Sequence, residues 1–96
     1  MSAYLVVSLD IDDREVFRQY QRGVVRTFTI GEGKVLSATA AAEGIEGEAP
    51  RGWNVLVEFP SIAMAHKWYH SPEYQEVKAL RLASSSNATI RLMEGL

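Results

Sequence analysis

The segment from Trp53 to Phe59 limits the possible folds of this chain more than any other. Side chains alternate between the two faces of a strand, and every second residue here is large and apolar. This apolar face consists of Trp53, Val55, Val57 and Phe59. The opposite face still contains Leu56, and Pro60 ends the run. The pattern predicts a strand with apolar side chains on both faces.

Three further strands are predicted, with one long loop. Ala3–Leu9 is short, apolar and rich in Val and Leu, and Val35–Ala41 is a weaker candidate. Ser84–Asn87 is predicted as a break, after which Ala88–Glu94 forms the last strand. The glycines and the proline of Glu43–Gly52 predict a loop before the strand at Trp53.

The first helix is predicted to begin at Asp12, because Asp12 and Glu15 have the spacing of a capping pair. Apolar residues then recur every three or four positions, and Gly31 and Gly33 end the helix. The apolar stripe consists of Val16, Phe17, Tyr20, Val24 and Phe28. Its spacing predicts a helix that packs one face against the rest of the chain.

A second helical segment follows Pro60 in two parts. Ser61 is a predicted cap for a helix that runs to about His70. Ser71, Pro72 and Glu73 repeat the start signal, since proline is well tolerated at the first helical position. The sequence therefore predicts two helices that meet at Ser71.

The order strand, helix, strand, strand, helical segment, strand predicts an α+β fold of the ferredoxin-like β-α-β-β-α-β type. We expect one domain over residues 1–96, with a four-stranded antiparallel sheet and its helices on one face. The uncovered face would expose Val6, Leu56 and Met93. Burying each large apolar side chain stabilises by about 1.5–3 kcal/mol, so we expect a homodimer that covers this face.

Composition excludes several classes of function. Ten Lys and Arg residues against twelve Asp and Glu give a net charge of −2, so nucleic acid is not an expected partner. The chain has no cysteine, which excludes disulfides and thiolate metal sites. No apolar run reaches the length of a membrane span and no leader is recognised, so we expect no membrane contact and a cytoplasmic location.

Several runs of the sequence resemble the domain of unknown function 1330 family. They include Val57–Ser61, Trp68–Gln75, Arg81–Ser84, the opening Ala3–Val7 and the closing Met93–Gly95. The resemblance covers nearly the whole chain and implies a dimeric α/β barrel, in which two ferredoxin-like protomers pack their sheets face to face. That superfamily includes cofactor-free monooxygenases, lactone isomerases, haem enzymes and small stress proteins, so the resemblance selects no reaction.

Arg81 is the first candidate for a site residue. It lies seven residues after Tyr74, on the same side of the predicted helix, and it interrupts an apolar stripe. A buried arginine needs an anion, which could be a ligand carboxylate, the carboxylate of Glu58 or a carboxylate of the partner subunit. The sequence leaves these alternatives open.

Aromatic residues near Arg81 complete the candidate ligand pocket, which consists of Tyr20, Trp68, Tyr69, Tyr74 and Arg81. Aromatic side chains with polar tips suit a pocket wall, although core packing is the favoured interpretation of Trp68, Tyr69 and Tyr74. Glu58 and Tyr20 could each transfer a proton, but a structural ion pair is favoured for Glu58.

His66 and His70 are four residues apart, a spacing that can hold a metal ion. The chain contains no third histidine. The favoured interpretation is that His66, Lys67 and His70 form the solvated side of a helix. We therefore predict no metal and no cofactor, and keep His66 as a weaker candidate for a proton-transfer residue.

Three functions remain open at this point. The leading prediction is a small organic acid or aromatic metabolite bound in a pocket between helices and sheet. The alternatives are a cofactor-independent isomerase or monooxygenase, and a structural or assembly protein without a small-molecule site. The sequence does not decide whether the protein is an enzyme.

Overall fold

The computed structural model describes residues 1–48 and 52–96. Its elements are β1 Ala3–Ile11, α1 Arg14–Thr27, the 3-10 turn η1 Phe28–Gly31, β2 Lys34–Thr39, β3 Trp53–Phe59, α2 Ile62–Tyr69, α3 Pro72–Ser84 and β4 Ser85–Glu94. This order confirms the predicted ferredoxin-like α+β fold.

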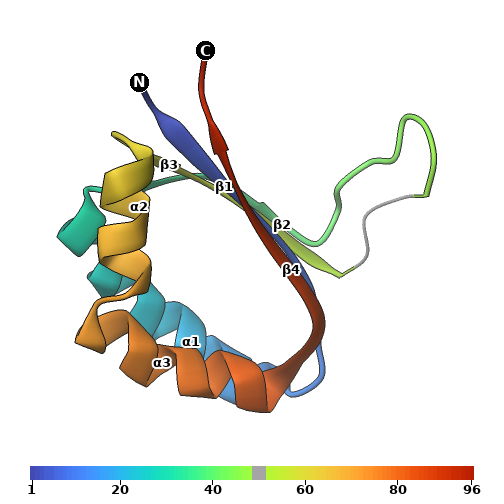
Figure 1. Ribbon diagram of the computed structural model, residues 1–96. Helices are drawn as coiled ribbons and strands as arrows, with labels where there is room; N and C mark the ends of the chain where they lie inside the picture. Colours follow the sequence, from blue (N-terminus) through green and yellow to red (C-terminus); the bar gives the residue numbers. More distant parts are fainter. Residues whose placement is uncertain (49–51) are drawn as a thin grey trace.

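The four strands form one antiparallel sheet in the order β2-β3-β1-β4. The helices lie on one face of the sheet, and residues 40–48, which follow β2, extend away from it (Figure 1). The amide of Gly95 donates to the carbonyl of Ser2 at 2.6 Å, which holds the two ends of the chain together. The sheet is open, with β2 and β4 at its edges.

The predicted start of the first helix is wrong by one residue. Asp13 is the cap, because its side chain accepts a hydrogen bond from the amide of Val16 at 3.2 Å. The Asp12 carboxylate instead accepts from the Ser86 hydroxyl at 3.1 Å. The α-helix ends at Thr27, and Phe28 begins the 3-10 turn.

The predicted break at Ser84–Asn87 is also wrong, because α3 passes directly into β4 at Ser85. Ser85 and Ser86 pair with Ile11 and Asp10, so β1 continues past Leu9. Sheet pairing overrides the weak strand preference of the serines. The predicted strand Val35–Ala41 likewise corresponds to β2, which ends earlier, at Thr39.

Both predicted caps of the second helical segment are confirmed. The Ser61 hydroxyl accepts from the amide of Met64 at 3.1 Å at the start of α2. The buried Ser71 hydroxyl accepts from the amide of Tyr74 at 3.1 Å and donates to the carbonyl of Trp68 at 2.7 Å. One serine therefore fixes the end of α2 to the start of α3.

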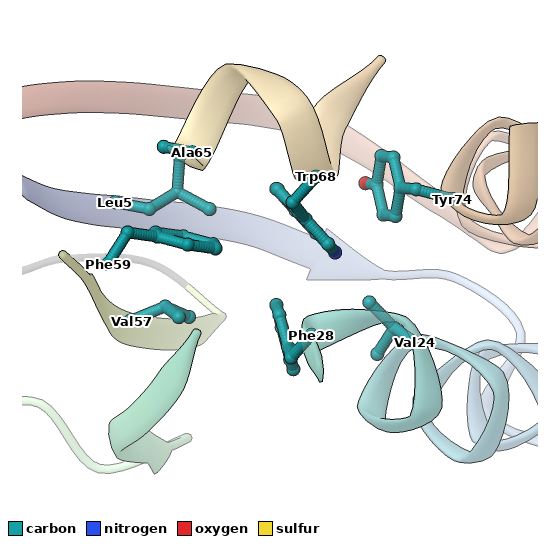
Figure 2. Close-up of a cluster of buried hydrophobic side chains, with 8 residues drawn as sticks. All are labelled: Leu5, Val24, Phe28, Val57, Phe59, Ala65, Trp68 and Tyr74. Carbon is teal, nitrogen blue, oxygen red and sulfur yellow. The ribbon is translucent and has the colours of Figure 1, made fainter. Parts of the chain in front are cut away.

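The core lies between the helices and the sheet (Figure 2). Its buried cluster consists of Leu5, Val24, Phe28, Val57, Phe59, Ala65, Trp68 and Tyr74. The Trp68 ring stacks on Phe28, with ring centroids 5.2 Å apart, and lies 4.2 Å from the centroid of Tyr74. Gly31 allows this packing, because a Cβ there would lie 2.5 Å from the carbonyl oxygen of Met64.

No helix of the described residues lies over the opposite face of the sheet, which we call the helix-free face (Figure 1). Val6 and Met93 remain 38% and 56% exposed on this face, in the isolated chain. Of the predicted loop Glu43–Gly52, residues 49–51 lie outside the described residues, and residues 43–48 have no regular structure. In the described part of the chain, no helix is long and apolar enough to cross a bilayer.

Candidate functional site

A cavity of about 150 Å³ lies between the helix layer and the sheet. All four strands and all three α-helices contribute to its lining, which is mostly apolar. The polar lining residues with oxygen or guanidinium groups are Tyr20, Gln21, Tyr74 and Arg81. No histidine, aspartate or glutamate occurs among the described lining residues. The described lining therefore combines an apolar interior with the cationic group of Arg81.

Arg81 is buried at 5% exposure in the last turn of α3. Its Nε atom has no hydrogen-bond partner in the described part of the chain. Among residues 1–48 and 52–96, no carboxylate forms an ion pair with its guanidinium. A buried cation without a counterion is costly, and Arg81 is one of the residues that line the cavity.

Tyr20 and Tyr74 join α1 to α3 beside Arg81. Their hydroxyl oxygens lie 3.1 Å apart, and either can donate to the other. Burial raises the pKa of the Tyr20 hydroxyl well above its usual range, and Tyr74 raises this pKa further. The nearby Arg81 guanidinium opposes the rise but does not overcome it. Tyr20 therefore stays neutral at ordinary pH and can give or accept a hydrogen bond.

Trp68 also lines the cavity, but its only polar side-chain group already forms a hydrogen bond within the protein. The indole Nε1 donates to the Thr27 hydroxyl at 2.8 Å, and that hydroxyl donates to the Val24 carbonyl at 2.7 Å. Trp68 therefore offers a ligand its ring alone. The ring points toward Phe28 and has Tyr74 beside it in Figure 2.

The mouth of the cavity lies between α1 and β2. Val25 of α1 and Val35 of β2 line the cavity and are 61% and 42% exposed, so the cavity reaches the surface there. The pairing of β2 with β3 shifts between Val35 and Ser37. This bulge places Ala38 in the lining together with Val35, three residues before it.

Tyr69 and His66 do not line this cavity. Both line a second pocket of about 180 Å³ between α2 and the sheet. His66, Lys67 and His70 are exposed, and the two imidazole rings are nearly parallel with centroids 5.7 Å apart. Lys78 Nζ lies 5.1 Å from the Tyr69 ring centroid. In the described residues, no group of three metal-binding side chains is found.

Glu58 lies on the face of the sheet that has no helices, away from Arg81. It is paired with Tyr4 across β3 and β1, and it accepts a hydrogen bond from the Tyr4 hydroxyl at 3.2 Å. Val57 and Phe59, its neighbours in β3, are buried on the helix side. Glu58 and Arg81 therefore do not form the ion pair that the sequence left open.

Several lining residues were not predicted as site residues. They include Phe17, Val24, Phe28, Trp53, Val55 and Ile90. Each has the periodicity of a core residue, and no sequence signal distinguishes a side chain that fills the core from one that borders a cavity. Thr27 was missed for a different reason, since its bond to Trp68 joins residues that are far apart in the sequence.

Solved structures with the same fold include proteins of unknown function and an oxygenase. A protein of unknown function from Rhodopseudomonas palustris has a TM-score of 0.80 and 19% identity, over 99% of this chain and 82% of that chain. A dimeric ferredoxin-like protein of unknown function from Jannaschia sp. CCS1 has a TM-score of 0.75 and 12% identity, over 99% of this chain and 100% of that chain. SnoaB, a cofactor-independent oxygenase from Streptomyces nogalater, has a TM-score of 0.68 and 10% identity, over 99% of this chain and 93% of that chain.

At such identities these likenesses establish the fold and no more. No curated protein matches the chain in sequence. The family model described as domain of unknown function (DUF1330) matches residues 2–96, which confirms the resemblance found in the sequence. The chain therefore belongs to the DUF1330 family.

Proposed function

We propose that this protein binds a small carboxylate with an apolar or aromatic body in the cavity between its helices and its sheet. The observation that supports the proposal is Arg81, which is buried, borders the cavity and has no carboxylate partner among the described residues. A planar guanidinium matches the geometry of a carboxylate. A bound anion would therefore offset the cost of burying the Arg81 charge.

The size and lining of the cavity support a ligand with a single ring. An apolar protein cavity of roughly 150 Å³ is large enough to bind benzene. The cavity here has a similar volume of about 150 Å³, and the rings of Phe28 and Trp68 form part of its wall. Benzoate, which joins one ring to one carboxylate, is thus a suitable first probe.

The polar groups of the cavity favour binding over proton-transfer chemistry. A cofactor-independent isomerase or monooxygenase needs a group that accepts a proton, and the described lining offers no histidine or carboxylate. The raised pKa of Tyr20 keeps its hydroxyl protonated, so no tyrosinate is present at ordinary pH to accept a proton. The fold shared with the oxygenase SnoaB keeps an enzyme as the alternative, and oxygen uptake with hydroxylated aromatic compounds would support it.

A homodimer is part of the proposal. Val6, Leu56 and Met93 lie on the face of the sheet that has no helices, and the similar Jannaschia protein is described as dimeric. Packing the same face of a second copy against it would bury these side chains. The cavity lies on the other side of the sheet, so each protomer would keep its own site.

The binding proposal is tested by isothermal titration with benzoate and with its neutral analogue benzyl alcohol. Wild-type protein should bind benzoate more tightly, and Arg81→Met should lose that preference. Lys67→Met removes one exposed cation from α2 and should bind like wild type. If benzoate and a panel of other aromatic and aliphatic carboxylates fail to bind wild-type protein, the proposal is wrong and a structural or assembly role is favoured.

A further inference from the structure

Four arginines follow one another at every fourth position along α1. They are Arg14, Arg18, Arg22 and Arg26, and all four are exposed. None forms an ion pair with a carboxylate of the described residues. They account for four of the ten basic residues in the chain, which leaves six to balance twelve acidic ones. An otherwise acidic molecule therefore concentrates positive charge on one helix.

Helix stability does not explain this row. Like charges four residues apart destabilise a helix by about 0.2–0.5 kcal/mol for each pair. Arg14 is also the first residue of α1, where the positive end of the helix dipole disfavours a cation. Only Arg26, in the last turn, lies where the dipole favours it.

The middle of the row borders the mouth of the cavity. Gln21 and Val25 line the cavity, and the 61% exposure of Val25 marks the side that opens to solvent. Residues three apart are neighbours on a helix surface, with Cβ atoms about 5–6 Å apart. Arg18 is thus the neighbour of Gln21, and Arg22 is the neighbour of Val25.

We propose that Arg18 and Arg22 steer anionic ligands into the cavity, so that the mouth selects for negative charge before Arg81 is reached. This inference rests on the proposed binding of a carboxylate at Arg81. A charged entrance raises the local concentration of an oppositely charged ligand and its rate of association. The effect acts through space and weakens as salt screens it.

The two sets of arginines have separable kinetic roles. Arg81 contacts the bound anion, so its loss should mainly raise the dissociation rate. Arg18 and Arg22 are exposed beside the mouth and act before binding, so their loss should mainly lower the association rate. Without these two arginines, the association rate should also depend less on salt concentration.

The test is NMR line-shape analysis of the Trp53 and Trp68 indole signals during titration with benzoate, since both tryptophans line the cavity. Arg18→Gln/Arg22→Gln should lower the association rate about threefold or more at about 20 mM salt. At about 0.5 M salt the double variant and wild type should associate at similar rates. Benzyl alcohol should associate equally with both proteins.

Lys67→Glu is the matched control, because it also lowers the net charge by two but lies on α2, away from the mouth. It should change the association rate much less than the double variant. The steering proposal is overturned if benzoate binds and the double variant associates at the wild-type rate, or if Lys67→Glu has the same effect. Failure of benzoate and the other carboxylates to bind wild type would instead overturn the proposed function, and steering with it.

Discussion

The hydroxyl oxygens of Tyr20 and Tyr74 lie 3.1 Å apart and join α1 to α3 at the wall of the cavity. Each residue was predicted at the sequence level on the apolar side of a separate helix. Their contact brings this partly buried hydroxyl pair next to the buried guanidinium of Arg81. The site is thus formed by tertiary packing of α1 against α3.

The first prediction concerns the pH dependence of stability. Burial raises the pKa of Tyr20 in the folded protein, whereas a tyrosine in the unfolded chain has a pKa of about 10. Above that pH the unfolded state loses this proton and the folded state keeps it, so the free energy of unfolding falls as pH rises. Urea unfolding between about pH 9 and 11 should therefore show a steeper loss of stability for wild type than for Tyr20→Phe.

Tyr4→Phe is the control for this experiment, because it removes a hydroxyl from the other face of the sheet and keeps Tyr20. Its profile should follow that of wild type. An equally steep loss of stability in Tyr20→Phe would show that another group causes the alkaline instability.

The second prediction concerns the anchor of Trp68. Thr27→Val removes the hydroxyl that accepts from the Trp68 indole at 2.8 Å, and so leaves a buried donor without a partner. The free energy of unfolding, measured by urea denaturation, should fall by about 1–3 kcal/mol. Thr29→Val removes an exposed hydroxyl that donates to the Arg26 carbonyl, and it should cost less than about 0.5 kcal/mol. Similar losses in both variants would mean that the buried hydrogen bond stabilises the protein no more than the exposed one.

The third prediction concerns the effect of Arg81 on the stability of the ligand-free protein. Because Arg81 is buried without a carboxylate partner among the described residues, Arg81→Met should leave stability unchanged or raise it by about 1 kcal/mol. Arg81→Ala removes the same charge but leaves more empty volume, and it should be less stable than Arg81→Met. A loss of more than about 2 kcal/mol in Arg81→Met would identify the guanidinium as a structural group.

The fourth prediction concerns assembly. Val6 lies on the helix-free face, so Val6→Asp would place a charge in the proposed dimer interface and should shift the protein toward monomer. Sedimentation equilibrium measures the shift. Ile45→Asp, at a residue that is 83% exposed beyond the end of β2, should leave the association state unchanged. A wild-type monomer, or a Val6→Asp dimer of wild-type affinity, would contradict the proposed interface.

Local patterns in the sequence were sufficient for most of the fold. The alternation in Trp53–Phe59 predicts β3 with its observed bounds, and Ser61 and Ser71 mark the starts of α2 and α3. Helix caps and strand alternation depend on neighbouring residues, which a sequence displays directly. Ser85 and Ser86 were wrongly predicted as part of a break for the opposite reason, since their strand conformation depends on pairing with β1.

The site was predictable only in part. Arg81 stands out because a charged residue interrupts an apolar stripe, whereas Phe17 and Val55 look like any core residue. Local sequence also could not separate Tyr69 from Tyr74, although their side chains line different pockets. That separation depends on the turn at Ser71 and on the direction of α3, which are properties of the folded chain.

Carboxylate binding at Arg81 is tested by a crystal structure of the protein with 4-iodobenzoate, in which anomalous scattering locates the iodine. The carboxylate should lie at hydrogen-bonding distance from the Arg81 guanidinium, with the ring inside the cavity beside Phe28 and Trp68. A probe found only at exposed arginines of α1 or on the helix-free face, with Arg81 closed off from it, would contradict the account.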